Sequence, residues 1–248
     1  DMQMTLALGQ AAPSTSSMPP IHVPFSVRVT RVSPTAGADL LINFSTFEVD
    51  AQGQLSAQTL TNLRKKLESL NDFSCTSSMT VRGRLSNMQC NLPSGNKEAS
   101  QVLQQIQNNV LNNAVVLPDV AVGIGAKWEI ESRGSLTDKL RFDQRVQYEL
   151  VNLRDQIATI RVAITQTAPQ QSYPVPEESG VPTVATLTHY SAQGGGTLSL
   201  DLNKTLPSSR TTSTVVQHTI IAQDKAEVKS GFPMKSEVKL KLRVSPQQ

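Results

Sequence analysis

The sequence predicts an α+β fold, in which two main helices pack on the apolar face of a large, curved antiparallel β-sheet, a half-barrel-like meander. In the first half of the chain, two segments carry apolar residues at helical spacing. In the second half, apolar and polar residues alternate, which is typical of antiparallel strands with one solvent-exposed face. No segment of about 20 to 50 residues repeats, which disfavours a solenoid or a propeller. Two helices embedded among many strands predict a single α+β domain over residues 1–248.

Before the first helix, the pattern predicts three strands. Residues 2–9 and 25–32 alternate apolar and polar side chains, and residues 39–49 are richer in apolar ones. Four prolines fall within residues 11–24, which predicts a flexible loop or an extended arm. A second flexible, proline-rich segment is expected at residues 168–182.

The clearest helical segment begins at Ser56, a favourable N-cap. Its leucines recur at intervals of three and four residues, so they share one face of a helix. These candidate ligand-facing residues are Leu60, Leu63, Leu67 and Leu70. Residues 97–112 predict the second helix, which has one apolar face and one face rich in glutamine and asparagine.

The change from helical to alternating pattern falls at residues 117–128, which include the protein's only tryptophan. Gly123 and Gly125 precede Trp128 and leave room for a close backbone contact or a positive φ. We expect Trp128 to be a largely buried core anchor at the entry to the main sheet. If Trp128 is instead exposed beside the two glycines, it becomes the best candidate for a binding site.

After Trp128 the alternation predicts strands at residues 140–150, 158–165, 198–202 and 237–244, and two more at 181–191 and 213–223. The three glycines at 194–196 are expected to interrupt this meander as a turn. Because the first helix needs an apolar partner, we expect its leucines to cover the strands around Phe142, Ile160, Leu200 and Leu240. A gap beneath the helix would form an aliphatic cavity.

The two cysteines are equidistant from Arg82-Gly83, so a hairpin that turns there places Cys75 opposite Cys90. This symmetry predicts a disulfide, which implies an oxidising compartment. The alternative is a pair of unpaired structural thiols. A two-residue turn would make the two cysteines a hydrogen-bonded pair, which suits a bridge less well, so a longer turn fits better.

Composition and motifs favour binding over catalysis. The net charge of +3 is small and scattered, which excludes a nucleic-acid partner, and no apolar run reaches the length of a membrane span. His22, His189 and His218 lack the spacing of metal ligands, and neither a dinucleotide fingerprint nor a nucleophile elbow is present. We therefore expect no enzymatic activity, no cofactor and no metal site.

Several short blocks resemble one family in their order along the chain. They are Leu-Ala-Leu-Gly at 6–9, Arg-Gly-Arg-Leu at 82–85, Asn-Leu-Pro at 91–93, and the block at 117–129 with its Leu-Pro and Val-Gly-Ile-Gly-Ala-Lys-Trp-Glu runs. The succession is similar to an uncharacterised family of bacterial secreted proteins and envelope lipoproteins with a Leu-Pro…Val-Gly-x-Gly-x-x-Trp signature. The resemblance implies a periplasmic or outer-membrane-associated location and supplies no catalytic residues. The lipid-anchoring cysteine of a lipoprotein is absent, so it was either removed or this member is soluble.

Together these observations predict a non-catalytic, extracytoplasmic binding protein of the bacterial envelope. One hypothesis is a carrier of a lipid or another apolar ligand, held between the sheet and the leucine face of the first helix. The alternative is a protein–protein interaction or structural module of the envelope. That module would act through its glutamine- and asparagine-rich helix or an unpaired sheet edge. A hydrolase is a distant third.

Overall fold

The computed structural model describes residues 2–8, 14–50, 56–68, 73–91, 115–135, 140–175, 183–204, 208–223 and 232–244. The chain divides into two compact units. The larger unit comprises residues 1–18, 123–200 and 208–248, and the smaller unit comprises residues 19–122 and 201–207. The chain therefore leaves the larger unit after its first strands and returns to it at Gly123. The single-domain expectation stays a prediction.

The α+β prediction is wrong, because the described residues form fifteen strands and one helix, α1 (Ala57–Glu68). The second predicted helix, at residues 97–112, lies outside the described residues. The prediction treated two helices as a main part of the fold, whereas strands make up most of the described residues. It also assigned to loops several segments that extend or add strands.

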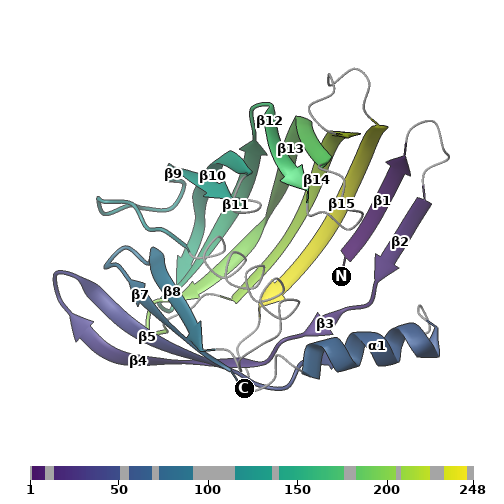
Figure 1. Ribbon diagram of the computed structural model, residues 1–248. Helices are drawn as coiled ribbons and strands as arrows, with labels where there is room; N and C mark the ends of the chain where they lie inside the picture. Colours follow the sequence, from purple (N-terminus) through teal and green to yellow (C-terminus); the bar gives the residue numbers. More distant parts are fainter. Residues whose placement is uncertain are drawn as a thin grey trace. The chain divides into compact units, whose positions relative to one another are not determined.

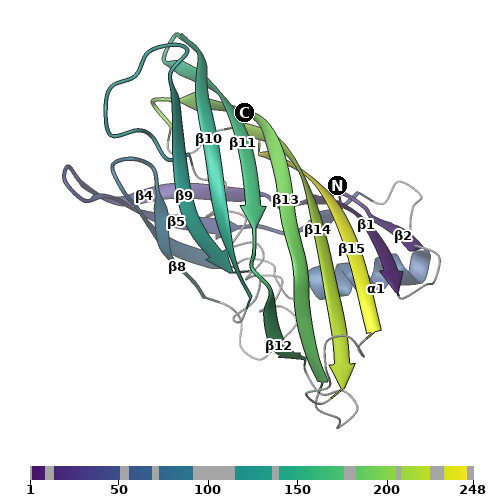
Figure 2. The same ribbon diagram turned by 90° about the horizontal axis from the view of Figure 1, so that it is seen from above.

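The larger unit is a nine-stranded antiparallel sheet with the order β2-β1-β15-β14-β13-β11-β10-β9, and β12 pairs with β13 beside this path. Figures 1 and 2 show these strands side by side, with β9 at one edge and β2 at the other. Their bounds are β1 Met2–Leu8, β2 Ser14–Met18, β9 Lys127–Ser135, β10 Arg141–Arg154, β11 Ile157–Thr167, β12 Gln171–Val175, β13 Thr183–Asp201, β14 Ser208–Gln223 and β15 Phe232–Val244. The first and last strands pair with each other in register, from Met2 opposite Leu240 to Leu8 opposite Met234.

One face of this sheet forms an apolar core, as the alternation predicts. Along β10, every second side chain from Phe142 to Leu150 is buried, while Arg141, Asp143 and Arg145 between them are exposed. Neighbouring strands continue the buried layer with Ala158, Ile160, Val162, Leu187, Leu198 and Leu200. Burial of each large aliphatic side chain stabilises the fold by roughly 1.5–3 kcal/mol.

The three glycines at 194–196 do not form a turn, because β13 runs straight through them. A side chain at Gly195 would approach the carbonyl oxygen of Val162 to within 2.9 Å. Glycine therefore allows β11 to approach β13 closely at this point. The two proline-rich segments also contribute strands, since β2 lies in the first and β12 in the second.

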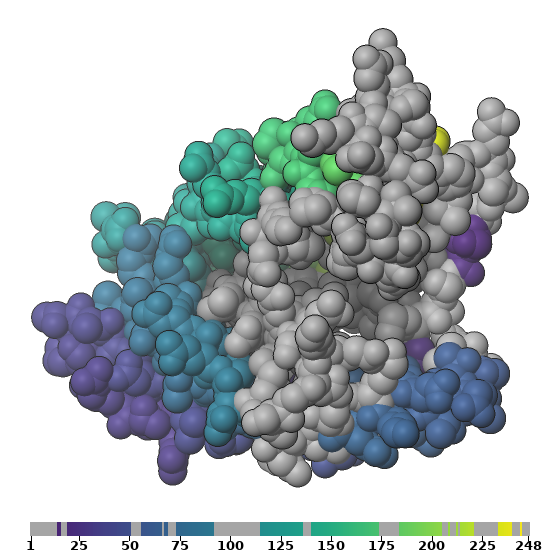
Figure 3. Space-filling model, viewed as in Figure 1, coloured from purple at the N-terminus to yellow at the C-terminus, as the bar shows by residue number. Residues whose placement is uncertain are grey.

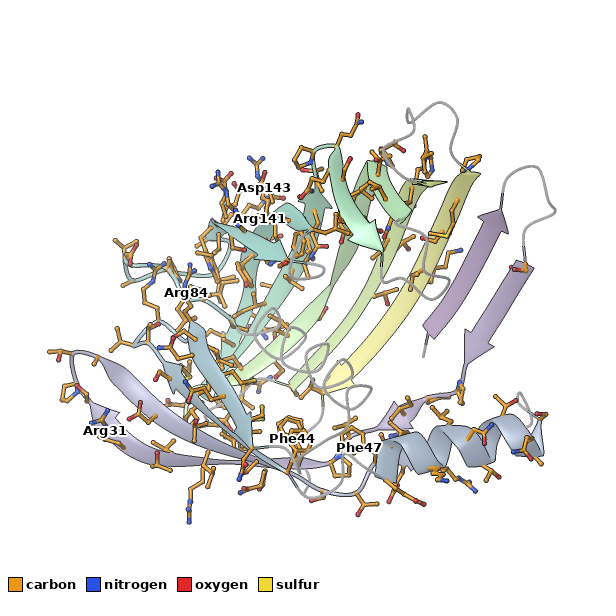
Figure 4. All side chains as sticks on the ribbon, in the orientation of Figure 1. Arg31, Phe44, Phe47, Arg84, Arg141 and Asp143 are labelled. Carbon is orange, nitrogen blue, oxygen red and sulfur yellow. A yellow bond between two sulfur atoms is a disulfide. The ribbon has the colours of Figure 1, made fainter. Side chains whose placement is uncertain are left out.

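The smaller unit contains a four-stranded sheet, a two-stranded sheet and α1. The four-stranded sheet has the order β4 (Phe25–Ser33), β5 (Gly37–Phe44), β7 (Ser74–Met79), β8 (Leu85–Asn91). The two-stranded sheet pairs β3 (Ile21–His22) with β6 (Glu48–Val49). Phe44 and Phe73 stack with ring centroids 4.5 Å apart, and Phe47 lies next to them in the same core. Figure 4 shows Phe44 and Phe47 pointing into this core.

Helix α1 confirms the predicted N-cap, because the amide of Thr59 donates a hydrogen bond to Oγ of Ser56 at 3.2 Å. Its partner differs from the one we expected. Leu67 is buried and Leu63 is half-buried in the core of the smaller unit, with Phe44, Phe47 and Phe73. Phenylalanines at the end of β5 and just before β7 therefore supply the apolar partner of these leucines, in place of the expected strands around Phe142 and Ile160. The rest of α1 is largely exposed (Figure 3).

Candidate functional site

Of the three described leucines that were expected to face an apolar ligand, only Leu67 is buried. Leu60 and Leu63 are half-buried, and Leu70 lies outside the described residues. Leu63 and Leu67 pack in the core of the smaller unit, so both side chains contribute to its stability. The expectation that these leucines face an apolar ligand stays a prediction.

The predicted disulfide between Cys75 and Cys90 is confirmed. The two residues are direct partners in the pairing of β7 with β8, and their Cα atoms are 4.0 Å apart. That separation is close to the ~4.5 Å of a non-hydrogen-bonded pair. The turn spans residues 80–84 and so is longer than two residues. An extra residue in β8 near Asn87 restores the opposition of the cysteines.

Two of the sequence blocks that carry the family resemblance meet at this turn, the blocks that begin at Arg82 and at Leu117. The Arg82 guanidinium donates to the carbonyl oxygen of Leu117 at 2.7 Å and forms an ion pair with Asp119 at 2.6 Å. Gly83 has a φ of +84°, and a side chain there would approach the carbonyl oxygen of Val115 to 2.5 Å. The arginine and the glycine together hold the segment at 115–119 against the hairpin. These contacts give both blocks a structural role.

Trp128 is half-buried at the start of β9, and its ring stacks on Tyr148 with centroids 5.3 Å apart. Gly125 supports the turn before it with a φ of +87°, and its amide donates to the carbonyl oxygen of Leu150 at 2.8 Å. Neither Gly123 nor Gly125 has an atom near the position of a Cβ. The positive φ therefore accounts for the glycine at position 125. Close backbone contact accounts for the glycine at neither position 123 nor position 125.

Strand β9 is the edge of the larger sheet on this side, since no described strand pairs with it opposite β10. Its nine residues pair with β10 in one continuous register, without a bulge or a proline. The other described edges are interrupted or short: β4 and β8 each lie in a pair with a register shift, and β2 has five residues. β12 is also five residues long and contains Pro174. Such irregularities protect edges from pairing with other chains, and β9 lacks them.

The outward face of β9 carries charges, but β10 neutralises most of them. Arg145 lies between two carboxylates, 3.2 Å from Glu129 and 2.8 Å from Glu131. Arg133 pairs with Asp143 at 3.3 Å. The hydrogen bond to Glu131 and the negative charges of both glutamates raise the pKa of Arg145. Figure 4 shows Asp143 and the neighbouring Arg141 near the start of β10.

A groove of about 640 Å³ crosses β9, β10 and β11 beside this edge. Its lining combines Trp128, Tyr148 and Ala163 with five charged or polar residues: Lys127, Glu129, Gln147, Glu149 and Arg161. Arg161 pairs with Glu149 at 2.7 Å, and Gln147 donates to Glu129 at 2.9 Å. The groove therefore offers both charged groups and an apolar surface.

The opposite face holds a row of hydrogen bonds across four strands. Nε2 of Gln144 lies 3.5 Å from Oγ of Ser132, and Nε2 of Gln166 donates to Oε1 of Gln144 at 2.6 Å. The hydroxyl of Tyr190 then donates to Oε1 of Gln166 at 2.8 Å. Burial raises the pKa of Tyr190 to about 12, so the phenol stays protonated as a donor at neutral pH. This row satisfies polar groups inside an apolar layer.

Two histidines also meet on the larger sheet. His189 of β13 and His218 of β14 are direct partners, and their rings are 5.1 Å apart. Lys235 of β15 lies opposite His218 on its other side. Burial, and then the charges of His189 and Lys235, lower the pKa of His218. The third histidine, His22, lies in the smaller unit.

Comparison with known proteins identifies no match: no family profile, curated protein or solved structure is similar to this chain. The resemblance to secreted and envelope lipoproteins therefore stays a prediction. Within the described residues, no helix is long and apolar enough to cross a bilayer. The same residues contain no cluster of three or more metal-binding side chains.

Neither the edge position of β9 nor the pairing of the two histidines was predicted from the sequence. The alternation of Trp128, Ile130 and Ser132 with charged residues is a usable strand signal. The edge position depends on pairing between distant strands, which this local pattern does not contain. The histidine pair depends on a register shift in β13, and the sequence carries no clear signal for that shift.

Proposed function

We propose that the protein is a non-catalytic, extracytoplasmic binding protein that captures a polypeptide by adding it as a strand to β9. The observation that carries this proposal is the unprotected state of this edge: nine residues in continuous register, without proline or bulge. The disulfide between Cys75 and Cys90 supports an oxidising compartment.

An edge strand presents a row of backbone N–H and C=O groups that can pair with an extended chain. Each hydrogen bond formed contributes roughly 0.5–1.5 kcal/mol, so several along β9 would support measurable affinity. Charged side chains at an edge normally discourage such pairing. Here Glu129, Glu131 and Arg133 are already paired with β10, which weakens that protection.

The side chains of β9 define the partner's chemistry. On the inner face, Trp128 and Ile130 are half-buried, while Tyr148 and Val146 opposite them on β10 are 5% and 4% exposed. An added strand would cover Trp128 and Ile130, so we expect apolar residues on that side of it. On the outer face the added strand would lie beside Glu129 and Glu131, which favours basic residues. The partner segment is therefore extended and alternates apolar with basic residues.

A carrier of a lipid or another apolar ligand is less well supported. The apolar layer of the larger sheet is closely packed, with Ile160 and Leu187 1% and 0% exposed. The groove beside β9 places charged side chains, among them Glu129, Glu149 and Arg161, next to its apolar surface. Within the described residues, these features favour a protein partner over an acyl chain.

The fluorescence of Trp128, the single tryptophan, gives a direct test. A nine-residue peptide that alternates valine with lysine should shift its emission to shorter wavelength in a saturable manner. The same peptide with alternate backbone amides N-methylated along its pairing edge should not bind. Glu131→Lys should weaken binding, and Glu68→Lys on α1, a matched change in the smaller unit, should not.

Equal binding of the N-methylated peptide would overturn strand addition. Native mass spectrometry of protein purified without detergent provides the second arm. A co-purified amphiphile, together with no response to the peptide, would favour the carrier instead.

A further inference from the structure

The structure places two of the protein's three histidines directly opposite each other on adjacent strands. His189 and His218 are Cα partners in the pairing of β13 with β14, and their ring centroids are 5.1 Å apart. Figures 1 and 2 show these two strands side by side along their length. The pair lies several strands away from β9, so it is independent of the proposed binding edge.

A bulge creates this arrangement. Leu187 pairs with Thr219, and the register then shifts by one residue before His189 pairs with His218. Without the shift, Thr188 would lie opposite His218. Bulges commonly redirect a side chain where a sheet serves a function. The shift therefore brings two imidazoles together that the regular register would keep apart.

The distance between the rings suits a shared ion. A transition metal binds imidazole nitrogen at ~2.0–2.1 Å, so two imidazoles on adjacent positions of one ion have ring centres about 5 Å apart. Nε2 of His218 is buried and has no hydrogen-bond partner among the described residues. A buried, unpaired imidazole nitrogen requires an explanation, and a bound ion or water would supply its missing partner.

We propose that His189 and His218 form a two-histidine clasp for a divalent transition-metal ion such as Zn²⁺ or Cu²⁺, with water completing the coordination. Imidazole is a preferred ligand of these ions, whereas Mg²⁺ and Ca²⁺ prefer oxygen ligands. Oγ of Ser191, 3.2 Å from Nε2 of His189, positions that ring. Because the two ligands come from different strands, the ion ties β13 to β14 at the bulge.

Lys235 limits the affinity of this site. It lies opposite His218 on β15, and its positive charge opposes a bound cation. Glu237, the nearest acidic residue along β15, forms an ion pair with Lys239 at 3.4 Å. Replacement of Lys235 by a neutral residue should therefore strengthen metal binding at this site. The same change would leave the affinity of a metal site elsewhere on the protein unchanged.

Isothermal titration of the full chain with ZnCl₂ and with CuCl₂, after treatment with a chelator, tests the proposal. We expect one ion per chain, and no binding of Mg²⁺. His189→Gln and His218→Gln should each weaken binding at least ~10-fold. His22→Gln, the matched control, should leave it unchanged, and Lys235→Gln should strengthen it. Binding that survives both His189→Gln and His218→Gln, or that is lost in His22→Gln, would overturn the clasp.

A second measurement uses only the wild-type protein, so it does not require that any variant folds. Paramagnetic Cu²⁺, added at a small fraction of the protein concentration, should broaden the NMR signals of His189, His218 and Ser191 before others. Broadening centred on another part of the chain, or no broadening, would overturn the proposal.

Discussion

Arg145 of β10 reaches across to Glu131 of β9, with its Nη2 2.8 Å from a carboxylate oxygen, and its Nε lies 3.2 Å from Glu129. One arginine thus pairs with two carboxylates of the edge strand, which leaves the three side chains with one net negative charge. This relationship explains how β9 can present a charged face and still be open to pairing. It also makes Arg145 a residue whose removal should change partner choice.

Arg145→Gln should leave Glu129 and Glu131 without their neutralising partner. We expect tighter binding of the alternating valine–lysine peptide and weaker binding of a matching valine–glutamate peptide. Arg141→Gln on the same strand provides a control, because no ion pair of Arg141 is found among the described residues. Trp128 fluorescence titrations with both peptides measure the change. A loss of affinity for both peptides would contradict this role.

Gly134 of the edge strand β9 and Phe142 of β10 form a second pair of residues in contact across these two strands. A Cβ at Gly134 would overlap the ring of Phe142, so the ring covers the glycine of the edge strand. Gly134→Val should destabilise the protein by about 1–3 kcal/mol through overpacking. Phe142→Ala should cost about 3–5 kcal/mol. In a double-mutant cycle followed by urea unfolding, the combined loss should be smaller than the sum, and strict additivity would contradict the contact.

The leucines of α1 should differ in their contribution to stability. Leu67→Ala removes a buried side chain of the smaller unit's core and should cost about 2–5 kcal/mol. Leu60→Ala, the matched control on the same helix, should cost clearly less because Leu60 is half-buried. Urea unfolding monitored by circular dichroism gives both values. Equal losses would show that α1 packs differently.

The disulfide should stabilise the protein. Its residues are 15 apart in sequence, and closure of such a loop contributes about 3 kcal/mol in the chain-entropy description. Cys75→Ala with Cys90→Ala should therefore lower the free energy of unfolding by about that amount. Thiol labelling of the unfolded, unreduced wild type should find no free cysteine. Two reactive thiols per chain would contradict the bridge.

Tyr190 should make stability depend on pH in the alkaline range. Burial raises its pKa from 10.0 to about 12, so the folded state keeps a proton that the unfolded state loses. Its contribution is complete below pH 10.0 and is lost as the pH rises toward about 12. A phenylalanine at position 190 does not titrate, so the Tyr190→Phe variant should not lose this stability as the pH rises. The advantage of the wild type in unfolding free energy over the variant should therefore shrink across that interval. A constant difference would show that Tyr190 titrates normally.

Local patterns in the sequence predicted local structure well. The symmetry of Cys75 and Cys90 about one turn predicted their bridge, and the alternation from Phe142 to Leu150 predicted β10 and its buried face. The turn predicted at 194–196 was wrong, because glycine marks a close approach of strands as readily as a turn. The leucine stripe predicted helix α1 correctly, but such a stripe shows that a helix needs an apolar partner without showing which one.

The candidate sites depend on information that local patterns lack. β9 is an edge because the order of the sheet places it last, a result of pairings between residues far apart in sequence. His189 and His218 meet because β13 contains a bulge, and a shift of one residue would separate them. Periodicity can assign strands, but pairing order and register decide what those strands bring together.

The most direct test of strand addition is hydrogen–deuterium exchange of the backbone amides of β9, with and without the alternating valine–lysine peptide. In the free protein, the amides of β9 that point toward β10 should exchange slowly and those that point away should exchange fast. With peptide bound, we predict that the fast amides of residues 127–135 become protected at every second position, while the other edge, β2, and the helix α1 stay unchanged. Protection spread over the groove without this alternation, or no protection of β9 at saturating peptide, would contradict the account.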